Sequence, residues 1–138
     1  MQSKKILSWA LRIIAAVILL QTLYFKFSAS EESVYIFSTI GIEPWGRIGT
    51  GIAELIASVL ILLPRTVSIG ALMAAGIMAG ALISHLTILG IVVKDDGGYL
   101  FSLCLIVMAC SIVLLFMYRH QLREIIKQLT ASRTKAIG

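Results

Sequence analysis

The sequence predicts an all-α integral membrane protein built as a four-helix bundle with antiparallel, up-down connections. Of its 138 residues, 59% are hydrophobic and only 14% are charged, whereas soluble domains are about half apolar and about a quarter charged. The hydrophobic residues gather in four long stretches, which charged or helix-breaking residues separate. This length allows a single membrane domain over residues 1–138 and leaves no room for a second one.

Each hydrophobic stretch is long enough to cross a bilayer as a helix, which takes about 20 apolar residues. We expect spans at about 6–27, 48–63, 67–93 and 99–118, and a tail at 119–138. Pro64 and Arg65 divide the second span from the third, and the polar run 94–98 divides the third from the fourth. Gly76 and Gly80 predict a close helix contact in the third span, since small residues let backbones approach.

Two further helices are predicted outside the spans. Between the first two spans, Ser30 suits a helix N-cap and Gly41 suits a helix end, so we expect a short amphipathic helix on the outer face. This helix is either a connector or a lid over the bundle. In the tail, apolar residues over 122–129 follow the i, i+3, i+4, i+7 pattern beside a basic strip. The basic tail helix suits an anionic membrane surface, which we prefer, or a docking partner.

The distribution of cations predicts the orientation, because lysine and arginine in short loops are retained on the cytoplasmic side. Lys4 and Lys5 precede the first span, Arg65 follows the second, and the tail is basic. The opposite side carries acidic residues such as Asp95 and Asp96. We therefore expect a multi-pass protein of the cell inner membrane with both termini in the cytoplasm. Its first partner is the lipid bilayer, and nucleic acid is not expected, since the net charge of +5 is spread along the membrane edges.

Ionisable residues inside the spans are the candidates for chemistry, because their burial in hydrocarbon is costly. Glu54 lies nine residues after Trp45, and His85 lies nine residues before Lys94. At 1.5 Å per residue, both lie about 13 Å below the outer edge of the bilayer core. We expect the two side chains to meet, either in a hydrogen bond that fixes helix register or in a site that handles a ligand or a proton.

The first span supplies the remaining candidates. Gln21 is a candidate hydrogen-bond donor, and Tyr24 and Lys26 complete the predicted polar pocket nearer the outer interface. For Lys26, a side chain that extends to the interface is slightly favoured over a role in the pocket. Arg12 lies about two turns inside the cytoplasmic edge, where we expect it to reach the lipid headgroups.

Several other kinds of site are not expected. The sequence contains no Cys/His metal cluster, Walker loop or nucleophile elbow, so we predict no metal site. A haem within one chain is not expected either, because His85 and His120 lie at different depths. Cys104 and Cys110 point about 120° apart around a helix, and we interpret them as packing residues.

Four short segments, by their order and spacing, resemble the DoxX-like family of small bacterial four-helix membrane proteins. They are Leu23-Tyr24-Phe25-Lys26-Phe27, Gly49-Thr50-Gly51-Ile52-Ala53-Glu54-Leu55, Leu63-Pro64-Arg65 and Gly80-Ala81-Leu82-Ile83-Ser84-His85-Leu86. The resemblance implies the four-span fold, and it places Lys26, Glu54 and His85 on family motifs without giving them a chemical role. Some relatives are described as small subunits of a thiosulfate:quinone oxidoreductase or of a terminal quinol oxidase, and others are linked to oxidative-stress and thiol-redox assemblies.

The resemblance therefore implies an accessory or quinone-associated subunit of a membrane redox system. Quinone is then the candidate ligand, and membrane or redox proteins are the candidate partners. Two alternatives stay open: a small transporter or lipophile-binding protein that uses a pocket at Glu54 and His85, and a scaffold subunit of a membrane complex. The sequence leaves open whether the protein is an enzyme and whether it forms a homo-oligomer.

Overall fold

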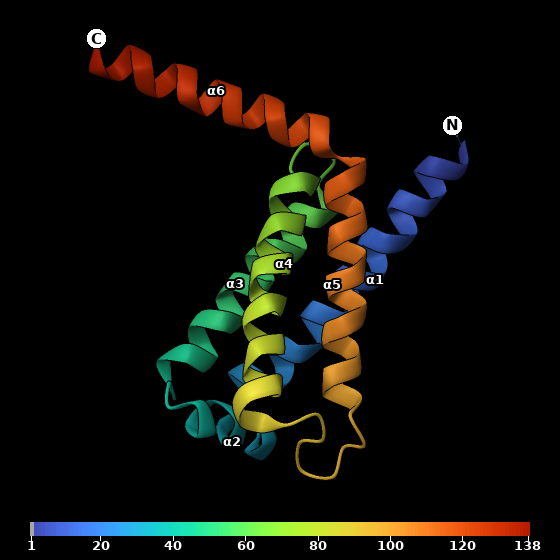
Figure 1. The fold of residues 1–138 in the computed structure, drawn as a ribbon, viewed down its shortest axis with the longest axis vertical. Helices are drawn as coiled ribbons and strands as arrows, with labels where there is room; N and C mark the ends of the chain where they lie inside the picture. Colours follow the sequence, from blue (N-terminus) through green and yellow to red (C-terminus); the bar gives the residue numbers. More distant parts are fainter. Residues whose placement is uncertain (1) are drawn as a thin grey trace.

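The computed structural model describes residues 2–138 and confirms an all-α membrane bundle. The helices that are long and apolar enough to cross a membrane are α1 (Gln2–Phe27), α3 (Trp45–Leu62), α4 (Val67–Ser84) with its π-helical extension η1 (His85–Leu89), and α5 (Tyr99–Met117). A short helix, α2 (Glu31–Ile40), connects the first two spans, and α6 (Arg119–Ile137) follows the last. Consecutive spans run in opposite directions (Figure 1).

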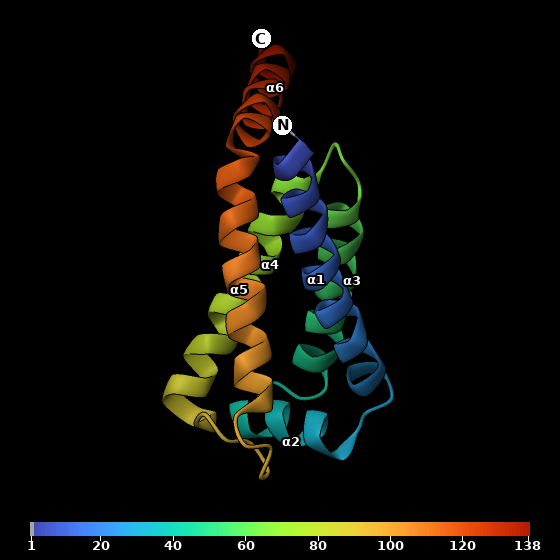
Figure 2. The same cartoon turned by 90° about the vertical axis from the view of Figure 1, so that its right-hand side faces the viewer.

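The four spans form a ring of neighbours. Helix α1 packs against α3 and α5, and α4 packs against the same two helices. Both termini lie at one end of the bundle, which we call the terminal end, and α2 crosses the opposite end, the α2 end (Figures 1 and 2). Helix α6 projects sideways from the terminal end (Figure 1).

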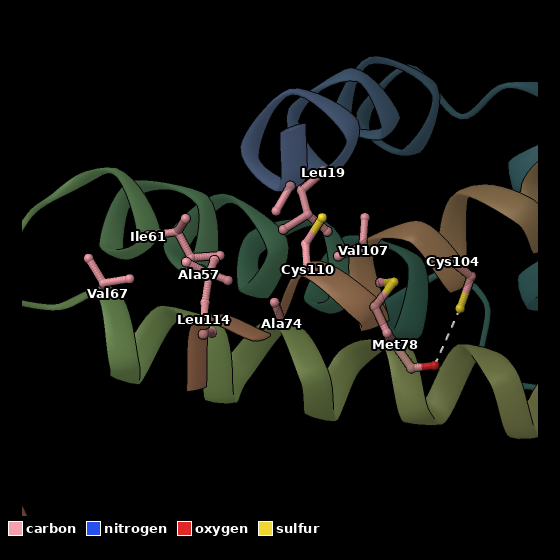
Figure 3. Close-up of a cluster of buried hydrophobic side chains, with 12 residues drawn as sticks. Leu19, Ala57, Ile61, Val67, Ala74, Met78, Cys104, Val107, Cys110 and Leu114 are labelled. Atoms are coloured by element: carbon pink, nitrogen blue, oxygen red, sulfur yellow. Dashed lines mark hydrogen bonds between the residues drawn. The ribbon is translucent and has the colours of Figure 1, made fainter. Parts of the chain in front are cut away.

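The core is built largely from small and medium-sized side chains, which suits helices that associate in lipid through close van der Waals packing. Ala57 is fully buried and Leu19 is 1% exposed (Figure 3). Cys104 and Cys110 are both buried and free, and the Cys104 thiol donates to the Met78 carbonyl at 3.4 Å (Figure 3). Both cysteines belong to the packed core.

The closest contact with a glycine of the third span is at Gly70, where α4 meets α3. A Cβ atom at Gly70 would lie 2.6 Å from the backbone nitrogen of Ile61 and 2.9 Å from the carbonyl oxygen of Ala57. At Gly76 and Gly80, by contrast, a Cβ would meet nothing within 4 Å. The prediction of a close contact at Gly76 and Gly80 is therefore wrong; both glycines border a cavity.

Arg12 was expected to reach the lipid headgroups, but it points into the bundle instead. Its side chain is buried, at 2% exposure, and donates to the carbonyls of Ile61 (2.7 Å) and Leu62 (2.6 Å) at the end of α3. The guanidinium also lies 3.8 Å from the centre of the Trp9 ring. The last carbonyls of a helix lack intrahelical partners and carry partial negative charge, so a cation that satisfies them inside hydrocarbon is strongly favoured.

The third span ends earlier than predicted. Its π-helical turn stops at Leu89, and Gly90 follows with a φ of +80° and a backbone N–H that bonds to the His85 carbonyl. Only glycine adopts such a backbone readily, so Gly90 ends the helix before Val93. The other predicted spans differ from the helices only at their ends, where helix boundaries are least defined.

The short helix predicted between the first two spans is present as α2, with the expected ends. The Ser30 hydroxyl accepts the backbone N–H of Ser33 at 3.3 Å, and Gly41 closes the helix with a φ of +91°. The loop between η1 and α5 contacts the start of α2 through a 3.1 Å ion pair between Lys94 and Glu31.

The basic tail helix is also present, as α6, and its first turns are tied to the bundle. The Gln121 carbonyl accepts the backbone N–H and the hydroxyl of Ser68, at 2.9 and 2.8 Å. Its amide nitrogen donates to the Pro64 carbonyl at 2.8 Å. Gln121 on α6 therefore caps the start of α4. Every residue of α6 remains at least partly exposed to solvent.

Candidate functional site

An apolar cavity of about 640 Å³ lies in the α2 half of the bundle. All four spans contribute to its wall, and α2 covers it with Ile36, Phe37 and Ile40. The expected alternative of a lid is therefore the better description of α2. The glycines at 76 and 80 leave room on the α4 side, because neither carries a side chain to fill it.

A polar cluster on the cavity wall joins α1 to α3. The Lys26 ammonium lies 2.9 Å from Oε2 and 3.2 Å from Oε1 of Glu54. The hydroxyl of Thr22, one turn before Lys26, lies 3.0 Å from Glu54 Oε2 and 2.7 Å from the Leu19 carbonyl, and these two acceptors share its single proton. The Glu54 side chain is 4% exposed and that of Lys26 is 14% exposed. This is a nearly buried ion pair, in which each charge depends on the other for its stabilisation.

Arg47 holds the end of α1 next to this cluster. Its Nε donates to Glu43 Oε1 at 2.7 Å, and its Nη1 makes a short hydrogen bond to the backbone carbonyl of Lys26. That carbonyl is one of the last in α1, and among residues 2–138 its only backbone partner is a long 3.4 Å hydrogen bond from the N–H of Ala29 in the turn that follows. By satisfying it, Arg47 fixes the position from which the Lys26 side chain reaches Glu54.

His85 lines the same cavity from the π-helical turn. Its Nδ1 lies 2.9 Å from the Gly90 carbonyl, and its ring packs edge-on against Phe101 with centroids 5.5 Å apart. Because a carbonyl can only accept, Nδ1 carries a proton in this bond. In the neutral ring, Nε2 is then an acceptor, and it makes no hydrogen bond to any of residues 2–138. Single π-helical turns are frequent at functional sites.

Asp96 anchors the loop that follows His85. Its Oδ1 accepts the backbone N–H groups of Val93 (3.1 Å) and Gly98 (2.8 Å), and its Oδ2 accepts that of Leu100 (3.1 Å). Burial on its own would raise the pKa of Asp96, but the three hydrogen bonds from backbone N–H groups outweigh it. The pKa of Asp96 therefore lies below its usual value, and the carboxylate fixes the start of α5.

The structure brings most of the predicted pocket residues together. Glu54, His85, Lys26 and Gln21 all line the cavity. Tyr24 does not line it: its side chain is 74% exposed and packs edge-on against Phe25 on the outside of α1.

The expected hydrogen bond between Glu54 and His85 is not present among residues 2–138. Glu54 binds Lys26 and Thr22 instead, and His85 binds the Gly90 carbonyl. Lys26 thus turns inward to the carboxylate, contrary to the favoured extension to the interface. A cation is a stronger partner for a buried carboxylate than a neutral imidazole.

Sequence reasoning missed Thr22 and Arg47. Thr22 gives little signal, since a threonine in a span commonly bonds to its own helix, as its contact with Leu19 illustrates. Arg47 follows Glu43 by four residues, and this spacing is the sequence signal that could have indicated their ion pair. Among residues 2–138, no group of three or more His, Cys, Asp or Glu side chains is placed to hold a metal ion.

A model of the DoxX-like family matches residues 10–114, which include every polar residue of the cavity wall described above. Comparisons with curated proteins and with solved structures found no match.

Proposed function

Because the chain belongs to the DoxX-like family, we propose that it is an accessory membrane subunit that binds a lipophilic ligand of the quinone class. The observation that carries this proposal is the apolar cavity of about 640 Å³ with an ion pair on its wall. Small-molecule sites are typically about 300–1,000 Å³, mostly apolar, and contain a few polar groups that orient the ligand.

The polar groups suit a ring that bears carbonyl or hydroxyl oxygens. Lys26 has three N–H donors, and its two contacts with Glu54 leave one for a ligand carbonyl. The Gln21 amide offers a second donor at the same wall. Nε2 of His85 offers an acceptor for a ligand hydroxyl. The apolar wall from α2 and α5 would hold the isoprenoid tail or the ring faces.

The proposal assigns electron transfer to a partner protein. Cys104 and Cys110 are free, buried and separated by more than one helical turn, and the Cys104 thiol is bonded to the Met78 carbonyl. They are poorly placed to cycle between dithiol and disulfide, since a disulfide needs Cα atoms within about 7 Å. The ligand would therefore be held here and oxidised or reduced elsewhere in an assembly.

Filling the cavity tests the proposal. Gly80→Leu and Gly76→Leu place a side chain in the open space, where a first atom meets nothing within 4 Å, so folding should be unaffected. In nanodiscs, the wild type should bind decylubiquinone, and each variant should bind it at least about tenfold more weakly, since filling a pocket removes the burial of the ligand. Ala10→Leu, at an exposed position outside the cavity, is the matched control.

Two results would refute the ligand proposal. One is unchanged decylubiquinone affinity in both glycine variants, with thermal unfolding like that of the wild type. The other is equal loss in the Ala10→Leu control. Uptake of the same probe into liposomes, where it depends on the protein, would instead favour the transporter alternative.

We further propose that the terminal end faces the cytoplasm in the cell inner membrane. Both termini lie at this end (Figure 2), together with Lys4, Lys5, Arg65 and the basic α6. Retention of such cations on the cytoplasmic side supports the assignment.

A further inference from the structure

A second cavity, separate from the first, opens at the terminal end between the first turns of α1 and the junction of α5 with α6. Its volume is about 720 Å³. We call it the basic groove. The cations Lys4, Lys5 and Arg119 line it, together with the apolar side chains of Leu7 and Phe116.

The positive charge of the basic groove is not neutralised within the chain. Lys4, Lys5 and Arg119 are all exposed, and none forms an ion pair with any of residues 2–138. The nearest acid along α6, Glu124, is already paired with Lys127 at 3.3 Å. Three uncompensated cations around one groove favour an anionic occupant.

The groove is also apolar below its rim. Leu7 is 49% exposed and Phe116 is 67% exposed, and both line it. The Arg119 guanidinium lies 4.5 Å from the centre of the Phe116 ring, which holds the cation at the boundary between the apolar and polar parts. Beneath them, a 2.5 Å hydrogen bond between the hydroxyls of Ser8 and Tyr118 joins α1 to the end of α5.

The position of the groove matches the headgroup level of a bilayer. Lys4 and Lys5 lie in the first turn of one span, and Arg119 directly follows the end of another, so the cations lie where hydrocarbon gives way to headgroups. Basic pockets between spanning helices are suited to anionic lipid headgroups. We propose that the basic groove binds an anionic phospholipid, with the phosphate between the three cations and an acyl chain along Leu7 and Phe116.

An anionic lipid fits better than a free phosphate ion. The cations alone would serve either, but the exposed apolar wall is favourable only for a ligand that carries hydrocarbon. This site does not depend on the quinone proposal, because none of the residues named for it lines the first cavity.

Lipid titration of the purified full-length protein in a nonionic detergent tests the proposal. Phosphatidylglycerol, phosphatidylcholine and inorganic phosphate are added in separate series, and bound lipid is counted by native mass spectrometry. We expect phosphatidylglycerol to bind at least tenfold more tightly than phosphatidylcholine, and the phosphate ion to compete only weakly. Each cation contributes about a fivefold change in affinity, so Lys4→Gln with Lys5→Gln should weaken binding by about 25-fold.

The matched control is Arg133→Gln with Lys135→Gln. It removes the same charge from exposed positions of α6 outside the groove, and glutamine keeps helix propensity similar in both double variants. Phosphatidylglycerol affinity in this control should fall less than threefold. Equal losses in the two double variants would overturn the proposal in favour of diffuse attraction. Equal binding of phosphatidylcholine, or displacement of the lipid by inorganic phosphate at matched concentration, would also overturn it.

Discussion

Removing one partner of the ion pair between Lys26 and Glu54 should destabilise the bundle strongly and unequally. At 2.9 Å and an effective dielectric constant of about 20, the gross attraction between the two charges is about 6 kcal/mol. Much of it offsets desolvation, and breaking such a buried pair from one side costs about 3–5 kcal/mol. Replacing both partners removes the stranded charge, so the double variant should lose less stability than the two single losses added together.

The two single variants should differ because the two groups differ in exposure. Lys26→Met leaves the Glu54 carboxylate, which is 4% exposed, with only the Thr22 hydroxyl, so we expect a loss of about 3 kcal/mol in the free energy of unfolding. Glu54→Gln leaves Lys26 with 14% exposure near the end of α1, from which it can extend to the interface. We expect a loss of about 2 kcal/mol there.

The assay is a double-mutant cycle, measured by detergent-induced unfolding of the purified protein in mixed micelles. The Lys26→Met and Glu54→Gln changes should be non-additive by about 2 kcal/mol. A second cycle between Glu54→Gln and His85→Ala should be additive within about 0.5 kcal/mol, because these side chains share a cavity but not a hydrogen bond. An additive first cycle, or strong coupling in the second, would refute the pairing described above.

Three further predictions concern the packing, the loop and the orientation. Gly70→Ala should cost about 3 kcal/mol because its Cβ would overlap α3 backbone atoms, whereas Gly76→Ala, with nothing within 4 Å, should be neutral or stabilising in the same unfolding assay. Asp96→Asn should cost about 1 kcal/mol at pH 7. Since the folded pKa of Asp96 is lowered, this contribution is present above its unfolded pKa of about 3.9 and is lost as pH falls through the folded pKa. A difference in the free energy of unfolding between variant and wild type that stays constant from pH 7 to pH 3 would contradict this expectation. In a cysteine-free background, a cysteine at Ser38, an exposed position on α2, should react with an impermeant thiol reagent in intact cells. One at Ser132, an exposed position on α6, should not, and the reverse pattern would invert the proposed orientation.

The fold was predictable because length and hydropathy are properties of the chain itself. Spans of about 20 apolar residues, breaks such as Pro64, and caps such as Ser30 and Gly41 determine helix number and order without knowledge of packing. The end of the third span was not predictable in this way. Gly90 ends the helix through a backbone conformation, while the apolar run continues to Val93 and gives no warning.

For the candidate site, the sequence predicted only how deep each polar residue lies along the membrane normal. The rise of a helix placed Glu54 and His85 at one level, and both do line one cavity. The helical rise could not give the rotation of each helix about its axis, and this rotation decides which side chains face each other. Nor could it show that Lys26, from a shallower level, would extend its long side chain inward to the carboxylate.

The two buried arginines explain how that pairing is held in place. Arg12, near the start of α1, satisfies the last carbonyls of α3, and Arg47, near the start of α3, satisfies a last carbonyl of α1. Because α1 and α3 are antiparallel, each helix thus caps the end of the other, and the two caps lie at opposite ends of their contact. A shift of α1 along α3 by one turn, about 5.4 Å, would separate both arginines from these carbonyls and leave those of Ile61 and Leu62 without partners in hydrocarbon. The caps therefore fix the register in which Lys26 meets Glu54, so the polar wall of the cavity depends on residues that do not themselves line it.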